Sequence, residues 1–107
     1  MSRPFSYNDE NFTVIGNILF LHVKITKNYN VWNNIVEIPN AIYERMYHKS
    51  LQIQISSNKD NYSTEKLIRS GIYKSTIDEK YYLYSSDKID KEFIGSYLVA
   101  WYALKDI

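Results

Sequence analysis

Two histidines are the side chains of this chain best suited to proton transfer or metal binding. His22 and His48 are separated by a predicted strand, a turn and Pro39, and no i,i+4 pair or HExxH-like spacing prearranges them around a metal ion. We expect His22 to be a core or interface residue and His48 to lie at the solvated end of a segment. The absence of cysteine excludes disulfides, thiolate zinc sites and thiol nucleophiles. The sequence therefore predicts no metal site and no cofactor.

The carboxylates do not form a pattern typical of acid–base catalysis. A general acid needs a carboxyl group in an apolar pocket that raises its pKa. The acidic clusters instead fall in predicted turns or at the start of the chain, at residues 9–10, 78–79 and 87–92. The 3 glycines, at positions 16, 71 and 95, are too far apart for a nucleophile elbow, a phosphate-binding loop or a dinucleotide-binding motif. We therefore expect a non-enzymatic protein with no catalytic residues.

Aromatic side chains are the most unusual feature of the composition, because they make up 16% of the chain and include 11 tyrosines. Tyr and Trp are common at protein interfaces and in sugar-contacting surfaces, but they also serve in cores and as cross-strand pairs. Alternation along residues 81–84 places Tyr82 on the opposite face from Tyr81 and Leu83, so at least one of these tyrosines should be exposed or covered by a partner. By residue type alone, the candidate ligand-contacting residues are Trp32, Tyr81, Tyr82 and Tyr84.

The charge and hydropathy of the chain argue against nucleic acid and against a membrane as partners. The formal net charge is +1, which gives no global field toward nucleic acid or an anionic membrane. Basic residues between positions 66 and 80 could interleave with aromatics along a single strand of nucleic acid, but acidic residues dilute them. The longest apolar run, residues 14–23, is far shorter than the roughly 20 residues that a spanning helix needs. We expect no nucleic-acid partner and no membrane insertion.

The elements that position these residues are indicated by period-two alternation, which is the signature of strands. In residues 18–25, Leu19, Leu21, Val23 and Ile25 share one predicted dry face, and Gly16-Asn17 before them can supply the positive φ angles of a tight turn. Residues 40–48 fit equally well one or two turns of helix or an irregular crossover. The other predicted strands are residues 12–15, 31–38, 51–56, 66–75, 80–84 and 93–104, with a loop at residues 56–63.

About seven short strands with at most one short helix predict an all-β fold, an antiparallel β-sandwich or jelly-roll-like arrangement. A chain of 107 residues has room for one domain, so residues 1–107 are expected to form a single domain in which residues 1–11 could be an extended N-terminal arm.

The last predicted strand, residues 93–104, is nearly apolar on both faces. A strand of that kind is either central in the fold or covered on its outer face by a partner subunit. We therefore favour a subunit interface over a ligand platform for this part of the chain. The candidate interface residues are Tyr97, Val99, Trp101 and Tyr102.

Three stretches of the sequence, IGNILFLHVKI, VWNNIVEIPNAIYERMY and IGSYLVAWYAL, carry a resemblance to a known family. The pattern resembles the small β-sandwich modules at the tips of bacteriophage tail fibres and baseplates. Residues 15–17, Trp32, Ile38-Pro39 and Arg45 occupy the matching places, and the resemblance covers residues 12–55 and, more loosely, residues 93–104. The chain departs from the family's loop, because residues 40–46 contain no glycine and no second proline.

The resemblance implies a non-enzymatic structural protein of a phage or prophage virion, in its tail, baseplate or head appendages. Such a protein would be made in the host bacterial cytoplasm and would assemble with itself as a trimer or larger ring. Its other expected partners are virion proteins and host surface carbohydrate. The alternative from another class is a small intracellular binding or inhibitor module, encoded by a mobile element, that covers the active surface of a host enzyme.

Overall fold

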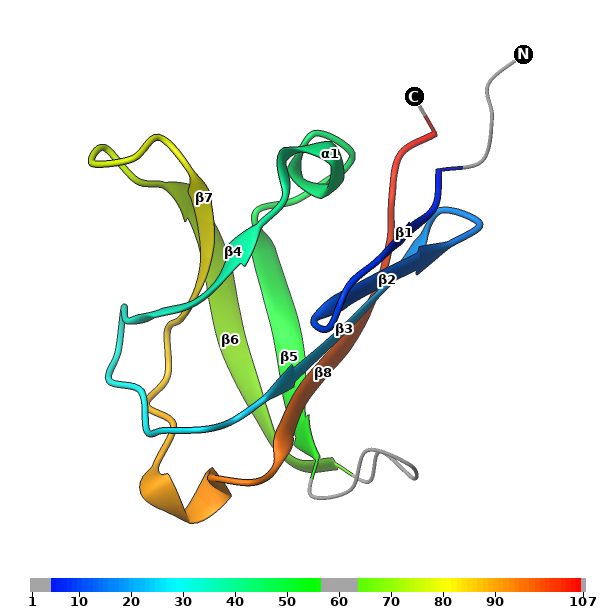
Figure 1. The fold of residues 1–107 in the computed structure, drawn as a ribbon. Coiled ribbons are helices and arrows are strands. Elements are labelled where there is room, and N and C mark those ends of the chain that lie inside the picture. Colours follow the sequence, from blue (N-terminus) through cyan, green and yellow to red (C-terminus); the bar gives the residue numbers. More distant parts are fainter. Residues whose placement is uncertain (1–4, 57–63, 107) are drawn as a thin grey trace.

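The structure is a computed structural model that describes residues 5–56 and 64–106, and within them eight antiparallel strands form one curled sheet (Figure 1). The strand order in the sheet is β1-β2-β3-β8-β5-β6-β7-β4. The elements are β1 (Tyr7–Asn8), β2 (Phe12–Ile15), β3 (Ile18–Lys24), β4 (Asn34–Ile38), α1 (Asn40–Tyr43), β5 (Ser50–Ser56), β6 (Thr64–Lys74), β7 (Tyr81–Ser85), the 3₁₀ turn η1 (Lys91–Phe93) and β8 (Tyr97–Ala103). The all-β prediction is confirmed.

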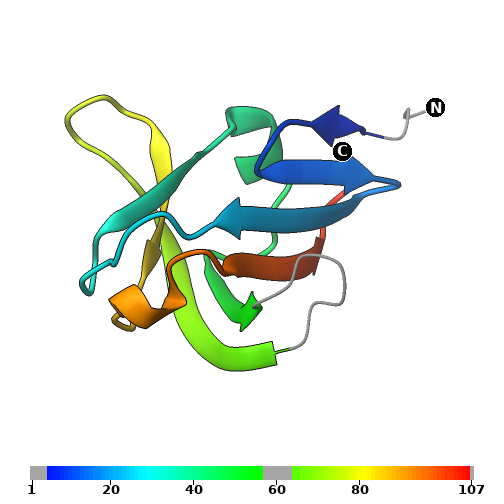
Figure 2. The same ribbon diagram turned by 60° about the horizontal axis from the view of Figure 1, so that its bottom comes forward.

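The strands do not lie in two separate sheets but in one sheet that curves round on itself as a half-barrel. Figure 2 shows β1, β2, β3 (blue) and β8 (red) side by side in one wall of the half-barrel. β4 (cyan) and β7 (yellow) lie on the left of this view. β8 pairs with β3 on one side and with β5 on the other, so the last strand is central in the sheet. The inner face of β8 packs in the core through Leu98 and Ala100, whereas Trp101 on its outer face is exposed.

The predicted turn at Gly16-Asn17 joins β2 to β3 as a two-residue hairpin. Both residues have positive φ, 55° and 64°, and the flanking Ile15 and Ile18 form the last pair of the ladder. A two-residue turn with two positive φ angles matches the twist of the strands on either side. The local sequence therefore fixes where this hairpin reverses.

Three segments differ from the sequence-based expectation. The predicted arm at residues 1–11 contains an edge strand, because Tyr7 pairs with Val14 after a turn in which Asp9 Oδ1 accepts the backbone N–H of Phe12 at 2.7 Å. Residues 31–33 form a turn, and β4 begins only at Asn34. Residues 91–93 form η1, so β8 starts at Tyr97 after Gly95, whose φ is 96°. The predicted loop at residues 57–63 lies outside the described residues.

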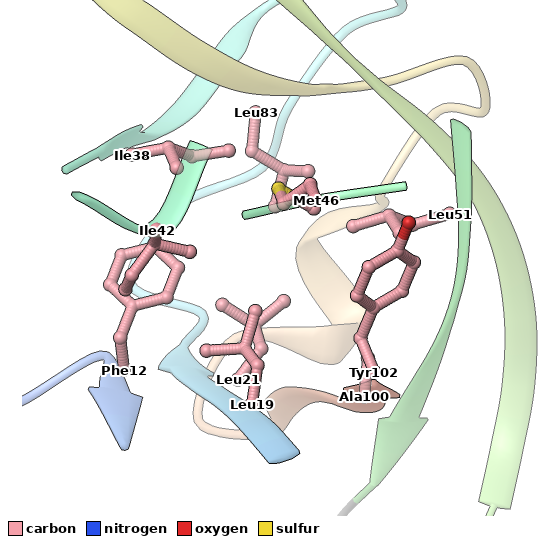
Figure 3. Close-up of a pocket in the computed structure, with 10 residues that line it drawn as sticks. All are labelled: Phe12, Leu19, Leu21, Ile38, Ile42, Met46, Leu51, Leu83, Ala100 and Tyr102. Carbon is pink, nitrogen blue, oxygen red and sulfur yellow. The ribbon is translucent and has the colours of Figure 1, made fainter. Parts of the chain in front are cut away.

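The inner face of the half-barrel is a packed hydrophobic core. The predicted dry face of β3 is confirmed, since Leu19, Leu21, Val23 and Ile25 are all buried. Residues 40–48 combine the two alternatives, because α1 is a single turn followed by an irregular connection that covers one end of the core with Ile42 and Met46. The space left among these side chains is ≈ 10 Å³, enough for at most one water molecule (Figure 3).

Candidate binding surfaces on the outer face of the sheet

The outer face of β2, β3 and β8 carries a contiguous apolar surface. The ladder register aligns Ile15, Ile18 and Ala103 in one cross-strand row and Thr13, Phe20 and Trp101 in the next row. The rings of Phe20 and Trp101 stack with centroids 4.9 Å apart. We call Ile15, Ile18, Phe20 and Trp101 the β3–β8 patch.

The β3–β8 patch contains no charged side chain, and its members are accessible. Trp101 is 54% exposed and Ile15 is 74% exposed. The His22 ring lies next to the patch at 5.1 Å from Phe20, with Nε2 3.5 Å from the Thr13 hydroxyl oxygen. Adjacent exposed apolar side chains of this kind are uncommon on soluble monomers and typically mark an interaction surface.

The four residues predicted to form an interface do not share one surface. Trp101 lies in the β3–β8 patch, and Tyr97 is half-buried further along the same face, beside Lys24. Val99 is on that face as well, but it is fully buried within the chain. Tyr102 lies on the inner face, because it pairs with the core residue Leu19.

Tyr102 is thus partly buried against the core and does not lie on the same face as Trp101. Its hydroxyl oxygen accepts the backbone N–H of His48 at 2.5 Å and lies 3.3 Å from the His48 carbonyl oxygen, to which the hydroxyl donates. The residue ties the connection after α1 to β8. Alternation along β8 separates Trp101 from Tyr102, although the two residues are adjacent in sequence.

The patch members Ile15, Ile18 and Phe20 were not among the predicted interface residues. They lie beside Trp101 only because of the register between three strands.

A second aromatic cluster lies on the outer face at the other side of the sheet. Trp32, Tyr73 and Tyr84 line a shallow depression, with ring centroids 5.1 Å apart for Trp32 and Tyr84 and 5.8 Å apart for Tyr73 and Tyr84. We call these three residues the aromatic platform. Tyr82 flanks it, with its ring centroid 6.2 Å from that of Tyr73.

The platform depends on the pairing of β6 with β7. Gly71 pairs with Tyr84, and a Cβ atom at position 71 would lie only 2.5 Å from the Tyr84 hydroxyl oxygen. The tyrosine ring therefore lies across the backbone of β6 at the one place where no side chain keeps it away. Trp32 reaches the same place from the turn before β4, where its backbone N–H donates to the Ser85 carbonyl oxygen at 2.9 Å.

Of the four predicted ligand-contacting residues, the structure brings Trp32 and Tyr84 together and places Tyr82 beside them. Tyr81 points to the opposite face, as the alternation predicted, and stacks on Tyr43 of α1 with ring centroids 3.6 Å apart. It therefore belongs to the packing of α1. Tyr73 was missed, because nothing in the local sequence of β6 indicates that it lies beside Tyr84.

Hydrogen bonds hold the tyrosines around the platform. The Tyr73 hydroxyl donates to Asn34 Oδ1 at 2.5 Å, and the Tyr82 hydroxyl donates to Asp78 Oδ2 at 2.5 Å. The Asp78 carboxylate also accepts the backbone N–H of Lys80 at 3.0 Å. The bond to Asp78 is the main reason that the pKa of Tyr82 rises from 10.0 to about 12, and the same bond is the main reason that the pKa of Asp78 falls below 3.8.

Replacing Asp78 with asparagine is expected to move the pKa of Tyr82 back toward 10.0, since the largest cause of its upward shift is the bond to the carboxylate. The measurement is the alkaline titration of tyrosinate absorbance, with Tyr82→Phe subtracted to isolate this residue. While Asp78 is ionised, the raised tyrosine pKa means that the bond stabilises the fold fully below pH 10 and that this contribution is lost as the pH rises through about 12. An unchanged Tyr82 titration in Asp78→Asn would contradict the assignment.

Within residues 5–56 and 64–106, no group of three or more His, Cys, Asp or Glu side chains could hold a metal ion. The helices in these ranges include none that is long and apolar enough to cross a membrane.

Comparison with protein families, with curated proteins and with solved structures finds no match to this chain. The fold, the β3–β8 patch and the aromatic platform are therefore the observations from which a function is argued.

Proposed function

We propose that the protein is a non-enzymatic structural subunit that assembles with copies of itself through the β3–β8 patch. The observation that carries this proposal is the stacked pair of Phe20 and Trp101, which lies on the outer sheet face in the row next to two exposed isoleucines. Aromatic residues surrounded by apolar neighbours and free of charge are typical of the centre of a protein interface. Alignment on rigid neighbouring strands means that little conformational entropy is lost when a partner covers them.

A second copy of the chain is the proposed occupant of the patch. The two central rows of the patch hold no ionisable group, so two copies can face each other without burying like charges. The formal net charge of +1 gives only weak long-range repulsion between copies. By analogy with the family that the sequence resembles, the expected assembly is a trimer or a larger ring.

The place of this subunit in a phage or prophage virion rests on the resemblance of residues 12–55 and 93–104. Two local features fit it: the Gly16-Asn17 turn, and the end of β4 at Ile38 directly before Pro39. Arg45 at the matching position places its guanidinium 4.0 Å from the centroid of the Phe5 ring. In this proposal the other partners are virion proteins and host surface carbohydrate, and genes for capsid, portal or tail proteins should lie beside this gene.

The wild-type protein is expected to sediment as a closed oligomer at micromolar concentration. Sedimentation velocity over a dilution series gives the mass of the assembly and distinguishes a closed oligomer from open-ended aggregation. A protein that remains a monomer throughout the series would contradict self-assembly. That outcome would favour the alternative of a monomeric inhibitor module, which uses the same patch to cover a host enzyme.

A further inference from the structure

Trp32 occupies a backbone position that disfavours it. Residues 30–33 form a tight turn, in which the Asn33 N–H donates to the Asn30 carbonyl oxygen at 3.1 Å and Asn33 Oδ1 accepts the Asn30 N–H at 2.9 Å. Trp32 is the third residue of this turn and has a φ of 72°. A positive φ at that position normally selects Gly or Asn, because a larger side chain crowds the backbone.

Packing within the chain does not account for the choice of tryptophan. Trp32 is 65% exposed, and its ring makes a tilted contact with that of Tyr84. Its place in the turn is held by the backbone N–H, which a glycine or an asparagine would also supply. Strain of this kind is typically kept where the side chain itself has a task. The inference is that the indole ring serves a ligand rather than the fold.

The rings of the aromatic platform surround a depression and do not form one flat wall. The plane of Tyr84 makes an angle of 38° with Trp32 and of 62° with Tyr73, and the Tyr84 ring fills the space that Gly71 leaves above β6. Such an arrangement offers two aromatic faces to a small rigid ring. The depression is short, since three rings line it, whereas a proline-rich helix needs an extended series of aromatic grooves.

The polar groups around the platform favour a neutral ligand. Glu37 lies 3.5 Å from the Lys80 ammonium group, and Asp87 lies 3.9 Å from the Arg69 guanidinium, so the nearby charges on β4 and β6 are balanced within the chain. The Asn34 amide oxygen accepts the Tyr73 hydroxyl at the rim, and an amide of this kind can also donate its N–H₂ group to a ligand acceptor. A cationic ligand would need a carboxylate available beside the rings, whereas the nearby Asp78 carboxylate already accepts the Tyr82 hydroxyl and the Lys80 N–H.

We propose that the aromatic platform binds a neutral saccharide, with the C–H face of one sugar ring stacked on Trp32 and Tyr84 and a hydroxyl group bound by the Asn34 amide. A pyranose ring combines an apolar face with hydroxyl groups at its edge, which matches aromatic faces bordered by an amide. The site lies apart from the β3–β8 patch in the sheet order and does not depend on assembly. It specifies which residues would carry carbohydrate binding.

Affinity electrophoresis in gels that contain amylose, galactan, mannan or cellulose derivatives tests the proposal. We expect at least one of these neutral polysaccharides to retard the wild-type protein, and Trp32→Gly to weaken the binding by at least about tenfold because a full aromatic stacking contact is lost. The Trp32→Gly protein should melt at the same temperature as wild type or higher, since glycine relieves the strained φ. No retardation by any of the four polysaccharides would overturn the proposal, as would selective binding to poly-L-proline.

Two further variants separate ligand binding from folding and from assembly. Gly71→Ala should also weaken retardation, because the new Cβ displaces the end of the Tyr84 ring while the backbone stays in place. Trp101→Glu should leave the affinity for a soluble fragment of the retarding polysaccharide unchanged in calorimetry, even where assembly is lost. Equal loss of binding in Trp101→Glu would place the saccharide on the β3–β8 patch and overturn the assignment to the platform.

Discussion

Replacing Trp101 with glutamate is expected to convert the assembled protein to folded protomers. Each copy would bring an unpaired carboxylate into the centre of the β3–β8 patch, where the side chain now stacks on Phe20. Burying an uncompensated charge at an interface costs about 3 kcal/mol or more, which weakens association by roughly a hundredfold or more. Sedimentation velocity at a fixed micromolar concentration should show the loss of the oligomer peak.

A matched control for Trp101→Glu is Ile77→Glu, which adds the same charge at a side chain that is 95% exposed in the turn between β6 and β7. Ile77→Glu should keep the wild-type mass. Circular dichroism should show a strand signal for Trp101→Glu like that of wild type, because the indole is half exposed and its removal leaves the core closed. A Trp101→Glu protein that stays fully assembled would show that the patch is not the subunit contact, and Phe20→Glu provides an independent second variant.

Replacing Ile42 with alanine is expected to lower the free energy of unfolding by about 2–5 kcal/mol, as large-to-small changes in a packed core do. Ile42 is fully buried, and with Met46 it is the part of the segment after β4 that closes one end of the half-barrel. α1 has a single turn and no side-chain hydrogen bond at its N-cap, so its position depends on this burial. Urea denaturation measured by tyrosine and tryptophan fluorescence gives the change.

The control for Ile42→Ala is Ile77→Ala, which should change the free energy of unfolding by no more than about 0.5 kcal/mol because the side chain is in solvent. The cavity left by Ile42→Ala would add to the ≈ 10 Å³ space already present among the core side chains. A loss below about 1 kcal/mol in Ile42→Ala would mean that α1 is not packed on the core. The m-value should equal that of wild type if unfolding exposes the same surface area in both proteins.

The strands and their buried faces could be predicted from the sequence because alternation is a local property. Leu19, Leu21 and Val23 were expected on one dry face and are buried there. In the predicted strand 51–56, Ile53 and Ile55 share one face and are fully buried. In each case the period of two is imposed by the extended backbone itself, so no knowledge of neighbouring strands is needed.

Local pattern failed where a contact from elsewhere in the chain overrides it. Val31 and Trp32 favour a strand, but the N–H of Trp32 donates to Ser85 and the backbone turns instead. Phe93 was taken into the last strand, but it ends η1, and its carbonyl oxygen accepts the N–H of Ser96 before β8 begins. β1 has only two residues and gave no alternation to detect.

The sequence by itself determined the all-β class, the turn at Gly16-Asn17 and which side chains of each strand share a face, since all three follow from the φ preferences and the pleat of short segments. Only the tertiary structure decided which strands are neighbours and in what register. That register places Phe20 beside Trp101 and Gly71 beneath Tyr84. Both candidate surfaces depend on such pairs, and no local signal encodes a contact between residues so far apart in the chain because strand order is set by the packing of the whole sheet.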